Sequence, residues 1–155
     1  MNQRGHWRDA ELAAASLEKR EGDRRTLLLL ARLPFVYAKV IEQLAGLRGG
    51  ASVYRSLERL EGAGLVATIR PPLQPGYAPR LHYLTDLGIA TVAVDQGREP
   101  EHLARRNRLR GRDLLAFLPG LPQLVAAYEL LGALAAARPG RPDLLAWERP
   151  WRRRY

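Results

Sequence analysis

The pattern of the chain changes period abruptly at Gly64, and this change restricts the possible folds more than any other feature. Residues 51–63 (ASVYRSLERLEGA) place their large apolar side chains on one helical stripe. The next six residues, LVATIR, are rich in β-branched side chains and predict a strand. Residues 71–79 hold four prolines and a glycine, so they must form a loop, and RLHYL at 80–84 predicts the return strand. We therefore expect a helix that leads directly into a small β-hairpin.

A second short helix is predicted immediately before this one. Residues 37–45 (YAKVIEQLA) carry apolar side chains at helical spacing, and a glycine-containing turn at 46–50 follows. On the helix at 51–63, Val53, Leu57 and Leu60 form the apolar stripe. The opposite face is expected to carry hydroxyl and basic residues, namely Ser52, Arg55, Ser56 and Arg59. Two short helices joined in this way are typical of a helix-turn-helix.

Two helical segments are predicted upstream of this pair. Residues 9–20 (DAELAAASLEKR) are rich in alanine, and Asp9 is a suitable N-cap. The segment carries few large apolar residues, so it needs a surface to pack against. Residues 24–33 (RRTLLLLARL) are short and strongly apolar, and we expect Asp23 to cap them.

Downstream of the hairpin, Thr85 is expected to cap a helix over residues 86–94. The order helix, helix, helix, strand, loop, strand, helix predicts a winged helix, a mainly α fold with a small β-wing. Residues 114–118 and 121–137 are also predicted to be helical. The helix at 121–137 is apolar nearly all round, which predicts burial within its own domain or against another subunit.

We divide the chain into three parts on this basis. An N-terminal helical arm at 1–22 precedes the winged helix-turn-helix domain at 23–95, and an Arg-rich connector with a helical C-terminal extension occupies 96–155. In the extension, residues 144–151 (LLAWERPW) could start a strand. The helix at 121–137 is expected either to form a homodimer interface or to pack beneath the winged domain.

The charge of the chain favours an anionic partner. There are 25 Lys+Arg residues against 16 Asp+Glu, which gives a formal net charge of +9 and a pI near 10.7. All but two of the basic residues are arginine, a bias that a GC-rich genome also produces. Two thirds of the surplus lies after residue 95. Residues 105–112 (RRNRLRGR) could bind phosphates without sequence preference, or could be a solvated connector.

No catalytic or metal-binding pattern is present in the sequence. The three histidines stand far apart, there is no cysteine, and no motif of a hydrolase, nucleotide-binding enzyme or metalloprotease occurs. We therefore expect neither an enzyme nor a cofactor. Residues 1–22 do not resemble a signal peptide. The longest apolar stretch, residues 124–137, is interrupted by Glu129 and falls short of a membrane span, so a soluble, cytoplasmic protein is expected.

The predicted fold assigns specific roles to several basic residues. A helix fits the major groove of DNA, where arginine can pair with guanine through two hydrogen bonds and serine can reach a base or a phosphate. Arg48 in the turn is expected near the DNA backbone. Arg70 and Arg80, which flank the loop, are expected to contact phosphates. The alternative is a solvated amphipathic helix followed by a rigid turn with exposed arginines.

Three stretches, PFVYAKVIEQLAG (34–46), SVYRSLERLEGAGLV (52–66) and PRLHYLTDLG (79–88), resemble the replication-relaxation family. The resemblance implies a bacterial winged-helix protein of plasmids and mobile elements, involved in their replication or conjugative relaxation. It also implies binding of double-stranded DNA through the helix at 51–63. The residues that correspond to the family's DNA-binding helix are Ser52, Tyr54, Arg55 and Arg59.

The chain departs from the family in two places. Members usually carry a threonine where this chain has Val36-Tyr37, and they commonly continue past a strand like residues 144–151, so a truncated or minimal version is expected. Regulators of the PadR and MarR types share the YLTDLG stretch, which keeps transcriptional regulation as an alternative. A protein–protein adaptor and the DNA-docking part of a nuclease or relaxase are further alternatives.

Overall fold

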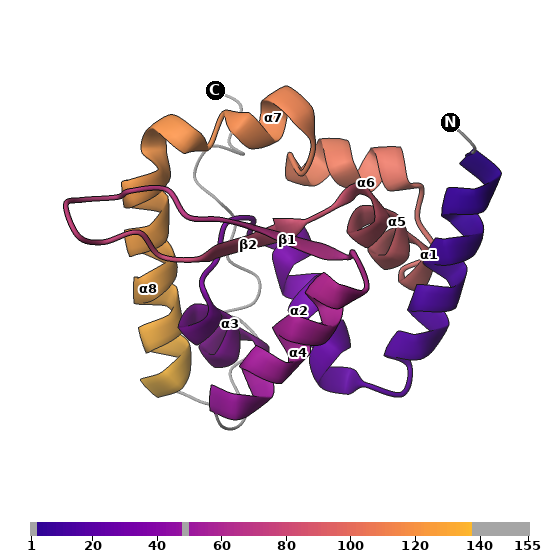
Figure 1. Cartoon of the computed structure of the whole chain (residues 1–155), viewed down its shortest axis with the longest axis horizontal. Helices are drawn as coiled ribbons and strands as arrows, with labels where there is room; N and C mark the ends of the chain where they lie inside the picture. The colour runs from indigo at the N-terminus through magenta and orange to yellow at the C-terminus, as the bar shows by residue number, and fades with distance from the viewer. Residues whose placement is uncertain (1–2, 48–49, 138–155) are drawn as a thin grey trace.

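The structure, a computed structural model, describes residues 3–47 and 50–137, which are mainly helical with one small antiparallel sheet (Figure 1). The first four helices are α1 (Gln3–Leu17), α2 (Glu21–Arg32), α3 (Ala38–Ala45) and α4 (Gly50–Gly62). The strands β1 (Val66–Ile69) and β2 (Leu81–Leu84) follow. The remaining elements are α5 (Asp86–Asp95), α6 (Pro100–Asn107), α7 (Gly111–Leu115), the 3-10 turn η1 (Leu118–Gly120) and α8 (Leu121–Ala137). The predicted mainly α fold with a small sheet is confirmed.

The two predicted short helices, α3 and α4, form close to their expected bounds and pack against each other. Gly46 ends α3 in the left-handed conformation, with φ of 67°, and the C-terminal cap N–H donates to the carbonyl of Glu42. Along α4 the predicted apolar stripe is buried, and it comprises Val53, Leu57 and Leu60. The residue pattern of these helices therefore determines which of their sides face the core.

The two strands pair in an antiparallel register that joins Val66 to Leu84 at one end of the ladder. A third segment extends this sheet, because Val36 forms an isolated antiparallel bridge with His82 of β2. The backbone N–H of Val36 donates to the carbonyl of His82, and the N–H of His82 donates back to Val36. This bridge connects the residues just before α3 with the hairpin, and it was not predicted from the sequence.

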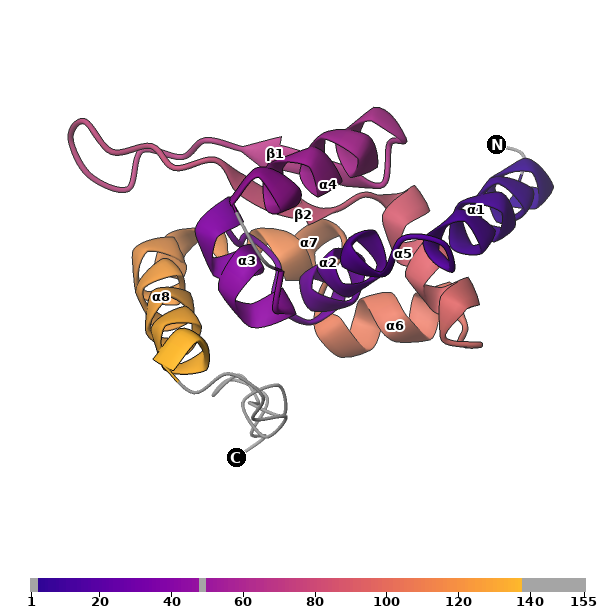
Figure 2. The same ribbon diagram turned by 90° about the horizontal axis from the view of Figure 1, so that it is seen from below.

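The first and last described helices, α1 and α8, pack on opposite sides of the helices and sheet between them. α1 lies along α5, and α8 lies along α3 on the opposite side (Figures 1 and 2). One continuous apolar core runs from Leu17 at the end of α1 to Leu131 in α8. The described parts of all three predicted segments therefore contribute to one core, and the division at residues 22 and 95 stays a prediction.

The N-terminal helices differ from their predicted bounds. α1 begins at Gln3, so Asp9 lies inside the helix and does not cap it. α2 begins at Glu21, which makes Asp23 its third residue. The Asp23 carboxylate is buried and bonded to α4, so the expected cap at this position is wrong. Asp23 has a tertiary partner, and a partner far away in sequence is invisible to a local capping rule.

The polar connector after α5 contains an unpredicted helix, α6. Pro100 stands in its first turn, and Arg108 ends it in the left-handed conformation, with φ of 56°. Only one narrow side, with Leu103 and Ala104, is buried, which is too short an apolar pattern to stand out among the arginines. Thr85 caps α5 as predicted, since its hydroxyl oxygen accepts from the N–H of Gly88 at 3.0 Å. The strand predicted at 144–151 lies outside the described residues.

α8 has the predicted bounds, but only one of its sides is buried. The hydroxyl of Tyr128 is buried and donates to the carbonyl of Pro34 at 3.1 Å. On the other side, Leu130 is 62% exposed and Leu134 is 47% exposed. Within the described residues of one chain, α8 is therefore buried on one side and presents an apolar outer face on the other, so burial of that face against another subunit stays a prediction.

Together with η1, α8 makes a 20-residue helical stretch, Leu118–Ala137, with mean hydropathy of 1.3. By length and composition it is the one helix in the described residues that could cross a membrane. The expectation that no apolar segment reaches this length is therefore wrong, because η1 extends the helix at its N-terminal end. A third of the stretch (33%) is buried inside the protein, and the core helix of a soluble protein can have the same length and composition.

Candidate nucleic-acid interface

The outer face of α4 is exposed and carries three of the predicted site residues. Ser52, Tyr54 and Arg55 are all exposed, with 65% of Tyr54 open to solvent. α4, β1 and the loop between the strands lie along one side of the molecule, away from α6 (Figure 2). This side therefore combines a helix with a free basic and hydroxyl-bearing face and a projecting β-hairpin loop.

Ser56 does not belong to this face. Its side chain is buried, and its hydroxyl donates to Oδ1 of Asp23 at 2.6 Å. The reason is its position three residues after Val53 and four before Leu60, which places it on the apolar stripe. The assignment of Ser56 to the exposed face is therefore wrong, and its role is to bind α4 to α2.

Arg59 is half-exposed, with 42% of its side chain open to solvent, and it is also paired with Asp23. Its Nε donates to Oδ2 at 3.1 Å and its Nη2 donates to Oδ1 at 2.6 Å. The hydrogen bond with Asp23 raises the pKa of Arg59. Arg59 thus sits at the edge of the α4 outer face with one side of its guanidinium engaged and the other open.

The two arginines that flank the loop are in different situations. Arg70 is exposed and forms no ion pair with any described residue. Arg80 donates from Nη2 to Oε2 of Glu61 at 2.5 Å, which connects the start of β2 to the last turn of α4. The positive charge of Arg70 is therefore more available to a partner than that of Arg80, although both arginines flank the loop in the sequence.

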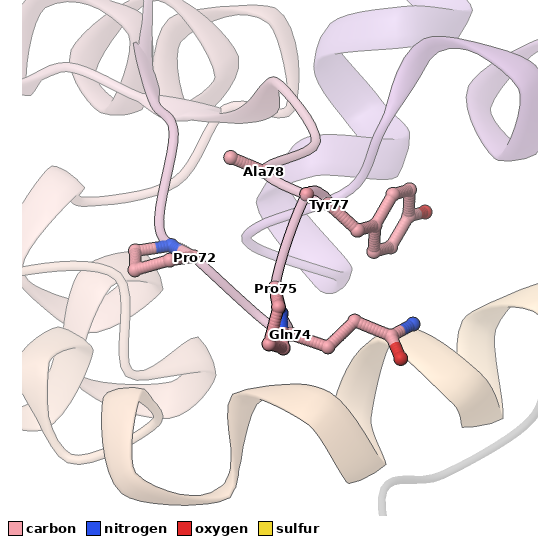
Figure 3. Close-up of a pocket in the computed structure, with 6 residues that line it drawn as sticks. Pro72, Gln74, Pro75, Tyr77 and Ala78 are labelled. Carbon is pink, nitrogen blue, oxygen red and sulfur yellow. The ribbon is translucent and has the colours of Figure 1, made fainter.

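The loop tip folds back on itself through a bridge between Gln74 and Tyr77. Figure 3 shows the shallow pocket on its surface, which is lined by Pro72, Gln74, Pro75, Gly76, Tyr77 and Ala78. None of these side chains carries a charge. The tip is thus a stiff, uncharged projection, and the cations lie nearer the strands.

His82 lies buried at the base of the hairpin, where its Nδ1 is 3.3 Å from Oε1 of Glu61. Neither atom has a hydrogen-bond partner among the described residues. Burial, together with the smaller effect of the positive charge of Arg80, lowers the pKa of His82 to about 4. His82 is therefore neutral at pH 7 and adds no charge to the surface.

The Arg-rich segment at 105–112 is partly engaged within the protein. The guanidinium of Arg108 lies 5.2 Å from the centre of the Phe117 ring, a cation–π contact. Arg110 donates to Asp86 at 2.7 Å and also to Glu101. Arg105 and Arg112 are exposed. Fewer of these charges are available to a partner than the sequence suggests.

The sequence did not predict that two acidic residues, Asp23 and Glu61, pair with arginines of this surface. Both hold arginines of the predicted site, and they come from elements that meet only in the folded chain. No signal in the sequence pairs them with these arginines.

Arg48 lies outside the described residues, so its expected position near DNA stays a prediction. The described residues contain no group of three or more His, Cys, Asp or Glu side chains that could hold a metal ion.

These features define a class: a mainly helical protein with an exposed basic helix face next to a β-hairpin loop. The sequence profile of the replication-relaxation family matches residues 27–154, which is most of the chain. The chain belongs to the replication-relaxation family, as its sequence motifs predicted. No curated protein and no solved structure matches it.

Proposed function

We propose that this protein is a winged helix that binds double-stranded DNA and acts in plasmid or mobile-element replication or relaxation. α4 is the recognition helix in the major groove, and the loop at 70–80 is the wing on the adjacent backbone. The observation that carries the proposal is the exposed face with Ser52, Tyr54 and Arg55 beside the half-open Arg59. Family membership supports the replication role.

The surface chemistry of α4 supports this assignment. An exposed arginine on a helix in the major groove can donate two hydrogen bonds to guanine, and an exposed tyrosine or serine can donate to phosphate. Arg70 can neutralise a phosphate at the same time, since α4 and the loop lie on one side (Figure 2). The uncharged loop tip favours backbone contact over deep insertion into the minor groove.

The proposal is tested by duplex binding over a range of salt concentrations. We expect Arg55→Ala and Arg59→Ala each to weaken binding, by roughly 1–3 kcal/mol where a base contact is lost. Arg98→Ala is the matched control, because Arg98 is exposed in the turn between α5 and α6 and its loss removes the same charge. Equal effects of all three substitutions would refute a recognition role for α4.

A protein–protein adaptor is the competing function, because Glu58 and Glu61 lie near the α4 face. A protein with a net charge of +9 should bind duplex DNA at least without sequence preference at about 50 mM salt. Absence of any binding under that condition would favour the adaptor. Specific binding with an effect on a neighbouring promoter would instead favour a transcriptional regulator.

For the exposed side of α8 the proposed partner is a second copy of this chain. Its outer residues are apolar, and burial between two copies removes them from water. Two copies would read two half-sites about one DNA turn apart. A cytoplasmic location fits this function, and the docking of α8 on α3 opposes membrane insertion. The proposal assigns the chain no catalytic step and no cofactor.

A further inference from the structure

The carboxylate of Asp23 is buried beneath the candidate DNA-binding face, and only 4% of the residue is exposed. It comes from the first turn of α2, where the helix dipole favours a negative charge. Three hydrogen bonds from α4 reach it: one from the Ser56 hydroxyl and two from the Arg59 guanidinium. A buried carboxylate is tolerated only when it is bonded in this way, so its partners are held in fixed positions.

The bonds to Asp23 occupy one edge of the Arg59 guanidinium. Nε and one N–H of Nη2 point to the carboxylate, at 3.1 and 2.6 Å. The Nη1 group makes no hydrogen bond with any described residue, and the side chain is 42% exposed. Because the guanidinium is planar with five N–H donors, its outer edge remains able to donate two parallel hydrogen bonds.

A fixed guanidinium differs from a free one in what it can recognise. An unrestrained arginine side chain samples many rotamers and can follow phosphates of any sequence. An arginine whose plane is already set loses less entropy on binding, and it fits only an acceptor pair in that plane. In the major groove, O6 and N7 of guanine are such a pair.

We propose that Asp23 is a positioning residue that orients Arg59 so that its outer edge reads a guanine. This inference rests on the proposed DNA binding by α4 and extends it from affinity to sequence preference. It makes Asp23 responsible for specificity although its carboxylate is buried and points to Arg59 and Ser56. The Ser56 hydroxyl donates to Oδ1 of Asp23, the same oxygen that accepts from Nη2 of Arg59, and so helps to fix the carboxylate.

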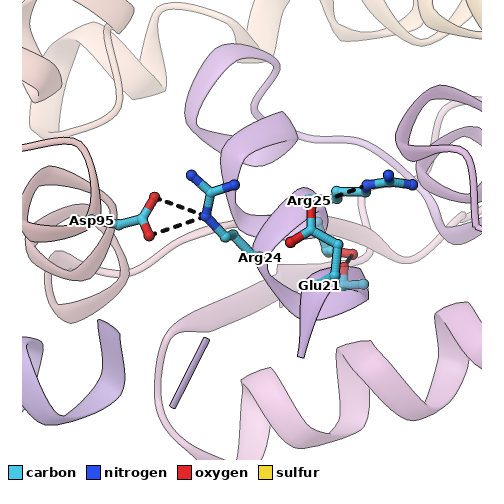
Figure 4. A network of polar contacts seen from close by, with 6 residues as sticks. Glu21, Arg24, Arg25 and Asp95 are labelled. Carbon is cyan, nitrogen blue, oxygen red and sulfur yellow. Dashed lines mark hydrogen bonds and ion pairs between the residues drawn. The ribbon is translucent and has the colours of Figure 1, made fainter. Parts of the chain in front are cut away.

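A second Asp–Arg pair that also involves α2 provides a matched control. Arg24 of α2 donates from Nε to both oxygens of Asp95, at 3.1 and 3.2 Å, and joins α2 to α5 (Figure 4). Asp95→Asn therefore removes the same kind of pair and the same charge away from α4. Any loss caused only by weaker packing or by the change in net charge should occur with both substitutions.

The experiment uses the duplex that the full-length protein enriches from a random pool. Guanines in that duplex are replaced one at a time by 7-deazaguanine, which lacks the N7 acceptor. We expect one position where the replacement weakens binding of the parent about tenfold. Asp23→Asn should reduce this sensitivity to less than about twofold, while Asp95→Asn should keep it. Asp23→Asn should also bind unrelated duplexes at least as well as the parent, because it removes a negative charge near DNA.

Arg59→Lys provides an independent variant if Asp23→Asn fails to fold. Lysine keeps the charge but cannot donate two parallel hydrogen bonds, so it should also lose the guanine sensitivity. If either folded variant keeps the tenfold sensitivity, the positioning role is wrong while DNA binding stands. Equal losses on the enriched and unrelated duplexes would show a purely structural role and also overturn it. If the parent enriches no duplex, the proposed function fails as well.

Discussion

Arg80 donates a 2.5 Å hydrogen bond from its Nη2 to Oε2 of Glu61, and this pair connects the base of the hairpin to the end of α4. The carboxylate of Glu61 neutralises much of the positive charge of Arg80 at this site. Arg70, directly after β1 of the same hairpin, forms no ion pair with any described residue. Two arginines that look equivalent in the sequence therefore differ in the charge that they offer to DNA.

The first prediction concerns this difference. Arg70→Ala should weaken DNA binding at all sequences and reduce the slope of log K against log salt by about 1. Arg80→Ala should have a smaller effect on the slope, because Glu61 already pairs with Arg80. Binding titrations at several salt concentrations measure both slopes. A larger change for Arg80→Ala than for Arg70→Ala would contradict the assignment.

The second prediction concerns the stability of the protein in acid. His82 is buried with a pKa of about 4, against about 6.5 in the unfolded chain, so the unfolded state binds its proton first. The free energy of unfolding should therefore fall as the pH drops from about 6.5 to 4, by about 3 kcal/mol in total. Glu61 and Arg80 are the charged groups next to His82, and both stay in place in the control.

His82→Gln is that control, because glutamine is polar and does not titrate in this range. Urea denaturation at pH 7 and pH 4.5 gives the free energies for both proteins. The parent should lose more stability than His82→Gln over this interval. Equal losses would mean that other groups cause the pH dependence.

The third prediction compares two glycines, Gly88 and Gly132, at which an added Cβ atom would lie very close to a neighbouring atom. A Cβ atom added at Gly88 would lie 2.1 Å from the carbonyl oxygen of Leu65, a backbone atom that cannot move without disturbing β1. Gly88→Ala should destabilise the protein by about 3 kcal/mol or more. At Gly132 the added Cβ would meet the flexible end of Gln43 at 2.3 Å. That side chain can swing away, so Gly132→Ala should cost less than about 1 kcal/mol. Thermal denaturation of the two variants measures the difference.

The fourth prediction concerns the outer face of α8. Leu130→Glu places a charge on the proposed contact between two copies, so it should convert a dimer into a monomer in size-exclusion chromatography with light scattering. Glu129→Gln is the control, since it removes a charge beside that face and keeps the face apolar. Folding should be unaffected, because Leu130 is 62% exposed. A monomeric parent would refute the proposed pairing of α8.

Most of the fold could be predicted because its signals are local. The apolar stripe of α4, the change of period at Gly64, the prolines of the loop and the Thr85 cap each depend on residues close together in sequence, and each predicted its element. The bounds of α8 followed from a long apolar run in the same way. α6 was missed because its buried side is narrow and its remaining residues are polar or basic.

The sequence by itself determined the order of helices and strands from α1 to α5, the helix that bears the basic face, and the family to which the chain belongs. Only the tertiary structure decided which of the predicted site residues are free. Ser56 turns into the protein, Arg59 and Arg80 are held by Asp23 and Glu61, and Arg70 stays open. The physical reason is that helix periodicity fixes a side chain's direction, whereas its partner is set by which distant elements the core brings together.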